Sequence, residues 1–195
     1  MSRFTGLRRQ QFRKYFQPSR LVLCVMPAPT TQSGFTVITL SFNMYCSYKP
    51  PMMAIAVEKV NESYELVQRA EEFVLAVPGE TLARETLQCG VLSVRDTDKI
   101  HTLGLALEPS QTVSVPGLSA AIANIELAKR AQVVCGDHVL VVGEVLRFAV
   151  DQANSSKPLI SLGPETDGFT VLETRGIHRI GIVGARTQDE PSSLP

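Results

Sequence analysis

A chain of 195 residues, of which 44% are apolar and 19% charged, is long enough to bury a substantial core and too apolar to be disordered over most of its length. We expect one folded domain, because the length is short for two. No apolar run could span a bilayer, and the start lacks the apolar core of a signal peptide, so we expect a soluble, cytoplasmic protein.

Charge is distributed unevenly along the chain, although the formal total is zero. The first 57 residues contain seven cations and no acid, whereas the remainder contains twelve cations and nineteen acids, so the two parts carry +7 and −7. This polarity would attract an anion such as a phosphate toward the N-terminal part of the fold. A solvated basic helix, or a tail that pairs with acidic residues of the same protein, explains it equally well.

The basic start is assigned to a separate segment, residues 1–17, ahead of a folded domain at residues 18–187 and a disordered tail at residues 188–195. An Arg-rich, acid-free start is also typical of an organelle transit peptide, which is an alternative to a cytoplasmic location. A weaker alternative is a nucleic-acid-binding arm, because Phe4, Phe12 and nearby aromatic side chains interleave with arginines and could stack on bases.

The first strands are predicted from apolar runs. Residues 21–26 form an unbroken run that is followed by a turn-rich stretch, which predicts a buried strand. Residues 35–42 and 52–57 are further runs, and neither can continue as a helix through the intervening Pro50-Pro51. We therefore predict three strands before residue 58.

Three short helices are predicted: over residues 64–72, between Thr81 and Cys89-Gly90, and between Asp96 and Gly104. Asn61 or Ser63 can cap the first, because short polar side chains accept hydrogen bonds from the free N–H groups at a helix start. Gly90 would allow a left-handed exit from the second helix.

Further strands are predicted at residues 73–77, 120–127, 132–135 and 139–148, with short edge strands at residues 159–163 and 176–183. The alanines of residues 120–127 also suit a helix, but their position ahead of two clear strands favours pairing with them. Gly136-Asp137-His138 predicts a hairpin with a three-residue connection. Recurring strands with short helices between them favour an antiparallel sheet or barrel over a doubly wound parallel sheet.

A cluster of hydroxyls, an amide and two prolines follows the second predicted strand, which is typical of a binding loop. The hydroxyls of Thr39 and Ser41 and the amide of Asn43 alternate along the chain. On a strand they would share one face, with Leu40 and Phe42 on the other. One face could then bind a ligand while the other packs.

This stretch resembles the flavin-binding segment of the flavin reductase-like family, whose flavoredoxin branch carries a Thr-x-Ser and then a Ser-x-x-Pro-Pro pattern before an apolar strand. The likeness covers residues 18–151 and continues through Cys89-Gly90, Ser93, Asp96-Thr97-Asp98-Lys99 and residues 136–145. It implies a mainly β fold, namely a six-stranded antiparallel Greek-key split β-barrel with a few short added helices. It also implies FMN as the cofactor and a homodimer.

The resemblance implies that N5 of FMN accepts hydride from NADH or NADPH and passes electrons to a flavin or another acceptor. No catalytic acid or base is required, and His101, His138 and His178 are interpreted as turn or surface residues. The chain lacks a Gly-x-Gly-x-x-Gly motif, so the nicotinamide would bind over the flavin without a domain of its own. The alternative is a flavoredoxin-like electron carrier that holds FMN and is fed by a redox partner protein.

The resemblance places backbone groups of residues 39–43 on the flavin ring. Hydroxyls there and in a second polar loop, residues 58–63, would hold the ribityl phosphate. A helix start at that loop would add N–H donors, whereas Glu62 and Glu65 would oppose a phosphate. The predicted FMN contacts are Thr39, Leu40, Ser41, Phe42, Asn43, Ser47, Asn61, Ser63 and Lys99.

Lys99 matches the lysine that follows a Ser-Gly-Arg-like stretch in the flavoredoxin branch, and it could pair with the phosphate as a point charge. Here that stretch has Val94 in place of glycine, and Val disfavours a positive φ. The alternative for Lys99 and Arg95 is an ordinary surface ion pair with Asp96 or Asp98.

The four cysteines are far apart, and no histidine lies beside any of them at ligand spacing. Without a secretion signal we interpret them as reduced thiols or small buried apolar residues, and we expect neither disulfides nor a structural metal. They are Cys24, Cys46, Cys89 and Cys135.

Overall fold

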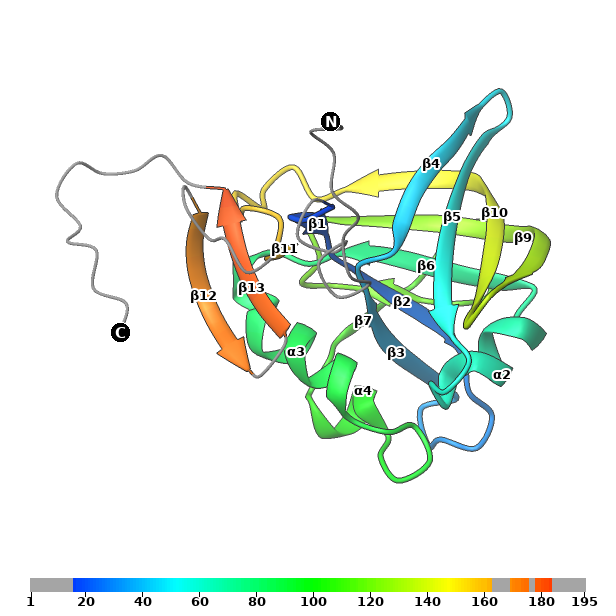
Figure 1. Ribbon diagram of the computed structural model, residues 1–195, viewed down its shortest axis with the longest axis horizontal. Helices are drawn as coiled ribbons and strands as arrows, with labels where there is room; N and C mark the ends of the chain where they lie inside the picture. The colour runs from blue at the N-terminus through cyan, green and yellow to red at the C-terminus, as the bar shows by residue number, and fades with distance from the viewer. Residues whose placement is uncertain (1–15, 163–168, 176–177, 184–195) are drawn as a thin grey trace, which may run out of the picture.

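The computed structural model describes residues 16–162, 169–175 and 178–183, and its main feature is a curled antiparallel sheet (Figure 1). Seven described strands form this sheet in the order β3-β2-β6-β9-β10-β5-β4. Their bounds are β2 Val22–Pro27, β3 Phe35–Leu40, β4 Asn43–Tyr48, β5 Pro51–Glu58, β6 Glu72–Val77, β9 Ala123–Cys135 and β10 His138–Val150.

Neighbours in the sheet are often distant in the chain. The strand β2 lies between β3 and β6, while β5 pairs with β10 rather than with β6, which follows it in sequence. Such a return of the chain beside an earlier strand is the arrangement of a Greek key. The predicted fold class, a mainly β antiparallel barrel with short helices, is confirmed, although the main sheet has seven described strands where six were predicted.

The large sheet is buried on both faces near its middle. Along β2, Cys24 and Met26 point into the barrel interior, whereas Leu23 and Val25 pack in a second core beneath the helices. The strand β6 divides its side chains in the same way. Because successive side chains on a strand point to opposite faces, two buried faces require an unbroken apolar run. This explains the uniform hydrophobicity of both strands.

A glycine on β10 permits a close contact inside the barrel. A Cβ added at Gly143 would lie 2.8 Å from the ring of Phe73 and 3.0 Å from a methyl of Leu127. The pairing of β9 with β10 shifts register between Val142 and Gly143, which bends the strand where it crosses the core.

The helices occur close to where they are predicted, with different ends. They are α2 Ser63–Arg69, the 3₁₀ turn η2 Glu80–Leu82, α3 Ala83–Val91 and α4 Lys99–Thr102. The helix α2 stops at Arg69, because Glu72 already begins β6. The predicted left-handed exit at Gly90 is wrong: Gly90 lies inside α3, and the chain leaves through an extended Leu92.

The β9–β10 hairpin is confirmed, but its connection has two residues, Gly136 and Asp137, rather than three. His138 belongs to β10 and pairs with Cys135. Gly136 adopts a φ of +61°, which a residue without a Cβ reaches at no steric cost and which the tight turn requires.

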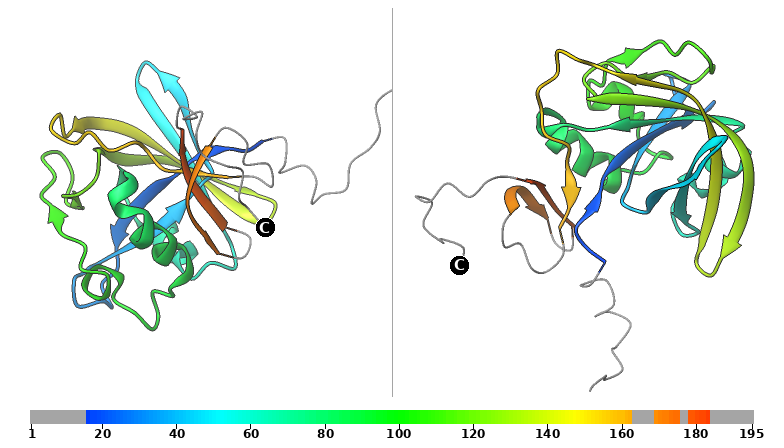
Figure 2. Two further views of the ribbon diagram at one scale, coloured as in Figure 1. Left: turned by 90° about the vertical axis from the view of Figure 1, so that its left-hand side faces the viewer. Right: turned by 90° about the horizontal axis from the view of Figure 1, so that it is seen from above.

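Two smaller sheets complete the described part. The strands β1 Ser19–Arg20, β11 Ile160–Ser161, β13 His178–Val183 and β12 Phe169–Arg175 form one sheet in that order, and β7 Leu107–Glu108 pairs with β8 Gly117–Leu118. Figures 1 and 2 show that β12 and β13 stand beside the large sheet, next to α3. The strands expected near residues 159–163 and 176–183 are present as β11 and β13, but neither is an edge strand of this sheet, because β11 lies between β1 and β13, and β13 between β11 and β12. The strand β12 was not predicted.

Residues 1–15 and 184–195, which contain most of the predicted basic segment and the predicted tail, lie outside the described residues. Among the helices that the structure describes, none is both long and apolar enough to cross a membrane.

Candidate functional site

The predicted binding loop after β3 is largely a strand. Residues Asn43–Tyr48 form β4, which pairs with β5 at the edge of the large sheet, with a register shift between Tyr45 and Ser47. The hairpin of β4 and β5 extends away from the barrel (Figure 1). The polar cluster that favoured a loop belongs to an edge strand, on which Asn43 and Ser47 are half-buried and the other residues are exposed. Ser47 lies on this strand opposite Met52.

Thr39 is tied to α3 rather than open to a ligand. Its side chain leaves β3 on the face that α3 covers, and its hydroxyl donates a hydrogen bond to the carbonyl of Thr86. A Cβ added at Gly90 would lie 3.5 Å from the Cβ of Thr39, so helix and strand are in close contact here.

The alternation predicted for residues 39–43 ends at Leu40. Leu40 is buried in the barrel core, but Phe42 is 50% exposed and stacks on the ring of His138, with 5.3 Å between centroids. The chain turns between β3 and β4, so the period of two does not continue through the turn. The prediction that Phe42 packs with Leu40 is therefore wrong. The predicted shared face of Thr39 and Asn43 is wrong as well, because Asn43 Nδ2 donates to the carbonyls of Arg20 and Leu40, at 3.0 and 3.3 Å.

An apolar groove lies beside this turn, on the outer face of β4, β5 and β10. We call it the outer groove; it measures about 320 Å³ and is lined by Phe16, Gln17, Ser19, Ser41, Phe42, Asn43, Met44, Ala54, Ala56 and Leu140. Met53, Ile55 and Val57 of β5 pack in the barrel core. The two alanines that alternate with them, Ala54 and Ala56, therefore face outward, and their small side chains leave space for the groove. Pockets of this size accommodate small ligands.

Two hydroxyls of the outer groove are unused by the described chain. The Ser19 Oγ is buried and has no hydrogen-bond partner in the described structure. The side chain of Ser41 makes no hydrogen bond to the residues that the structure covers. Buried polar groups are nearly always paired, so the Ser19 hydroxyl is an exception, but its oxygen is enclosed by the protein. The half-buried hydroxyl of Ser41 is the candidate for a bond to a ligand in the groove. The groove contains three of the predicted FMN contacts: Ser41, Phe42 and Asn43.

The second polar loop meets the stretch around Ser93. Glu62 Oε1 lies 3.3 Å from Arg95 Nε, and the Ser93 hydroxyl donates to the same carboxylate. The predicted alternative that Arg95 pairs with Asp96 or Asp98 is wrong. The structure thus brings together two segments that the sequence predicted to share a phosphate, with a carboxylate between them.

Neither predicted polar side chain of the second loop, the Asn61 amide or the Ser63 hydroxyl, is open in the same way. Asn61 Oδ1 accepts from the Ser63 N–H at 2.9 Å, which braces the start of α2, although Glu62 is the cap residue itself. Ser63 is buried.

Lys99 is buried, not a surface ion pair. It is 2% exposed, and its Nζ donates to the carbonyl of Cys89 at 2.9 Å. Burial lowers the pKa of the Lys99 ammonium, while the nearby Cys89 and Glu62 raise it in part. Val94 is also buried, and since no described residue other than glycine has a positive φ, the valine fits its loop without strain.

Asp98 begins α4 and binds the loop before β3. Its carboxylate accepts from the Ser33 N–H at 2.8 Å and from the Ser33 hydroxyl at 3.0 Å. It also caps α4 by accepting from the His101 N–H. Burial acts to raise the pKa of Asp98, but these bonds hold it below its ordinary value.

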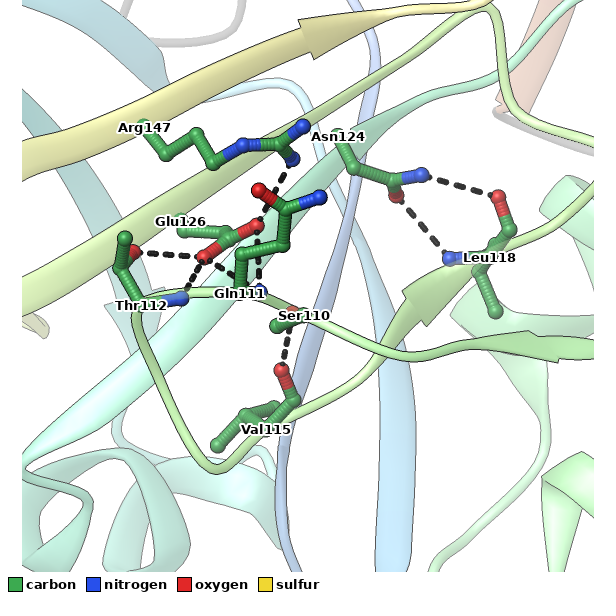
Figure 3. A network of polar contacts seen from close by, with 8 residues as sticks. All are labelled: Ser110, Gln111, Thr112, Val115, Leu118, Asn124, Glu126 and Arg147. Atoms are coloured by element: carbon green, nitrogen blue, oxygen red, sulfur yellow. Dashed lines mark hydrogen bonds and ion pairs between the residues drawn. The ribbon is translucent and has the colours of Figure 1, made fainter.

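Sequence reasoning missed a network around Glu126, which Figure 3 shows. This carboxylate, 1% exposed on β9, accepts from the N–H and hydroxyl of Thr112, both at 2.6 Å, and from the Gln111 N–H. Arg147 Nη1 lies 3.1 Å from Glu126 Oε1. Burial acts to raise the pKa of Glu126, but these donors lower it below its ordinary value. An acidic residue inside the apolar run at residues 121–128 was the available signal.

Metal binding is not indicated by the described part of the chain, where no group of His, Cys, Asp or Glu is placed to hold an ion. The cysteines are free thiols: Cys24 and Cys89 are buried, and Cys46 and Cys135 are exposed. Burial raises the pKa of Cys24, and it raises that of Cys89 to about 12, so neither is a ready nucleophile.

Residues 18–165 match the model of the flavin reductase like domain. The chain belongs to this family. An uncharacterized protein of Archaeoglobus fulgidus is 32% identical over 151 residues, which are 76% of this chain and 82% of the relative. The family match and the observed sheet confirm the resemblance noted in the sequence.

Solved structures share the fold. Flavoredoxin of Desulfovibrio vulgaris superposes with a TM-score of 0.71 at 20% identity over 99% of both chains. An FMN-binding protein of Thermus thermophilus with bound p-hydroxybenzaldehyde gives 0.73 at 17% over 96% of this chain and 99% of that one. An NADH:FAD oxidoreductase of Streptomyces globisporus gives 0.70 at 17% over 85% and 96%. The barrel is therefore the split barrel of these flavin reductase-like proteins.

Proposed function

We propose that this protein binds FMN and uses NADH or NADPH to reduce the flavin or, through it, another acceptor. The observation that carries the proposal is the outer groove at the β3–β4 turn, which is apolar and is lined by Ser41, whose hydroxyl makes no hydrogen bond to the described residues. Family membership supports a flavin-related redox role. Solved neighbours described as an FMN-binding protein and an NADH:FAD oxidoreductase agree with the cofactor and the donor.

The groove fits the flavin ring, which needs a flat apolar surface and polar groups at its edge. The half-buried Ala56 and the buried Ala54 form a smooth apolar floor beside residues 41–43. The hydroxyl of Ser41 is available for the ring or the ribityl chain. Phe42, stacked on His138, forms a firm wall.

The phosphate is assigned to the region of Ser93, Arg95 and Lys99. A phosphate accepts hydrogen bonds and prefers cationic donors. Thr39 donates its hydroxyl proton to a backbone carbonyl of α3, so it supports the site mainly by fixing α3 against β3. Ser93 and Arg95 bind the partly exposed side chain of Glu62, which can be displaced, so they replace Thr39 and Ser63 as the stronger phosphate candidates.

When bound, the flavin supplies the redox chemistry, because its N5 can accept a hydride from a reduced nicotinamide. The chain binds and orients the reactants and limits the access of water. His138 Nδ1 lies 2.7 Å from Asp137 and its ring packs on Phe42, so both contacts hold the ring in the wall of the groove. Hydride transfer to a flavin requires no acid or base from it. The nicotinamide would approach the ring from the open side of the groove.

A homodimer is part of the proposal. Phe42, Met44, Tyr45, Leu146 and Phe148 are each 40% exposed or more, on β10 and on β4 with the turn before it. Exposed apolar clusters of this kind mark contact surfaces. A second copy would cover them and complete the flavin cleft. A gel-filtration mass of one chain would contradict this part.

The enzyme and the electron carrier are separated by one experiment. Full-length protein, reconstituted with FMN, is mixed with NADH and separately with NADPH in the presence of excess flavin, and loss of the nicotinamide absorbance is followed. Steady oxidation of either nucleotide supports the reductase. Stoichiometric FMN binding without oxidation would contradict it and favour a carrier that takes electrons from a protein partner.

A further inference from the structure

A carboxylate of this chain occupies a place that is built for an anion. Glu62 is reached by the Ser93 hydroxyl and by the Arg95 guanidinium, 3.3 Å away. The Arg95 N–H donates to the Ser93 oxygen at 3.0 Å, which orients that hydroxyl toward the carboxylate. Donors from one loop thus converge on an acid from another loop.

The charges around Glu62 also favour an anion at this place. Lys99 lies close enough for the charge of Glu62 to raise its pKa against the effect of burial. Arg95 therefore pairs with the carboxylate directly, while Lys99, whose Nζ donates to the Cys89 carbonyl, lies near it. Without it they would carry +2, which matches the charge of about −1.5 to −2 on a phosphate monoester at neutral pH.

A phosphate and Glu62 cannot use these donors together. Ser93 has one hydroxyl proton, and two anions sharing one guanidinium repel each other in a partly shielded site. Glu62 can leave, because its side chain is 29% exposed and belongs to the residue just before α2.

We propose that Glu62 is an internal competitor for the phosphate of FMN, so that it weakens FMN retention without affecting binding of the flavin ring. This inference rests on the proposed function. It makes Glu62 a residue that sets the preference of the site between FMN and riboflavin, which has the same ring and no phosphate.

The test measures dissociation constants of FMN and riboflavin by quenching of flavin fluorescence, with full-length apoprotein. Glu62→Gln removes the charge and keeps the shape. Glu65→Gln is the matched control, because Glu65 lies three residues on and pairs with the exposed Arg69 at 3.1 Å. We expect Glu62→Gln to tighten FMN on the order of tenfold and Glu65→Gln to change it by less than about twofold. Riboflavin affinity should not change in either variant.

A further variant identifies the donors. Combining Glu62→Gln with Arg95→Gln should remove most of the gain, because the released guanidinium is what the phosphate would take. If Glu62→Gln leaves the ratio of FMN to riboflavin affinity unchanged while both still bind, the competitor role is overturned and the flavin site stands. If neither flavin binds any variant, the proposed function and this inference both fail.

Discussion

The loop at residues 109–115 and the outer groove use polar groups in opposite ways. In the loop, Glu126 accepts from Gln111, Thr112 and Arg147, while a second carboxylate, Glu72, binds both the N–H and the hydroxyl of Ser114 at 2.7 Å. In the groove, the half-buried Ser41 hydroxyl makes no hydrogen bond to the described residues. Paired polar groups stabilise a fold, whereas unpaired ones in a cavity are available to a ligand.

The loop network should produce the largest change. Glu126→Gln removes the buried charge and leaves Arg147 and two backbone N–H groups poorly satisfied, so we expect a loss of about 2 kcal/mol in the free energy of unfolding. Chemical denaturation measures it. The control is Glu144→Gln on the neighbouring strand, where the pair with the half-exposed Arg130 should contribute less than about 1 kcal/mol. Equal losses in the two variants would remove the distinction.

Filling the outer groove should weaken flavin binding and leave the stability of the fold nearly unchanged. Ala56→Leu fills the outer groove from its floor, and we expect flavin affinity to fall by about tenfold or more with little change in unfolding. Ala149→Leu, which projects into the separate polar cavity beside Glu126, is the size-matched control. Unchanged FMN affinity in Ala56→Leu would show that the ring binds elsewhere.

Two hydroxyls near the turn sharpen the comparison further. Ser41→Ala should weaken FMN and riboflavin alike, by about fivefold, because its hydroxyl is free to bond the ligand. Thr39→Ala should leave flavin affinity nearly unchanged and cost about 1 kcal/mol in unfolding, because its hydroxyl bonds α3. The reverse outcome, with Thr39 affecting affinity and Ser41 only stability, would exchange their roles.

The smallest expected effect is on the stability of the protein at low pH. The bonds from Ser114 hold the pKa of Glu72 below its ordinary value of 4.5, against a minor effect of burial. The unfolded chain therefore binds this proton more readily, so the stability that Glu72 contributes is present above pH 4.5 and is lost as the pH falls through the lowered pKa. Glu72→Gln should flatten the acid side of the stability curve by less than about 1 kcal/mol. An unaltered curve would contradict this contribution.

Much of the fold was predictable because runs of apolar residues mark the buried strands. The unbroken apolar runs in β2 and β6 reflect burial on both faces, and the turn formers Gly136 and Asp137 mark the hairpin. The strand β4 could not be predicted in this way. It is an edge strand with polar and aromatic residues, and its pairing with β5 depends on a turn at Lys49-Pro50 rather than on a buried face.

The sequence identified the segments that form the candidate site, but not which of their side chains are free to bind a ligand. Sequence resemblance selected the β3–β4 turn, residues 58–63 and the stretch around Ser93, which the structure places on adjoining elements. Which hydroxyl is free depends on tertiary contacts: Thr39 meets α3, whereas Ser41 faces the groove. The contact of Glu62 with Arg95 joins residues 33 positions apart, so no local pattern indicates it.

The most direct measurement is the visible absorption spectrum of the freshly purified full-length protein, followed by heat release and identification of any yellow compound. We predict a flavin spectrum, or its appearance on adding FMN to colourless protein, with one FMN bound per chain at saturation. A protein that is colourless and does not take up added FMN would contradict the assignment of the outer groove as a flavin site.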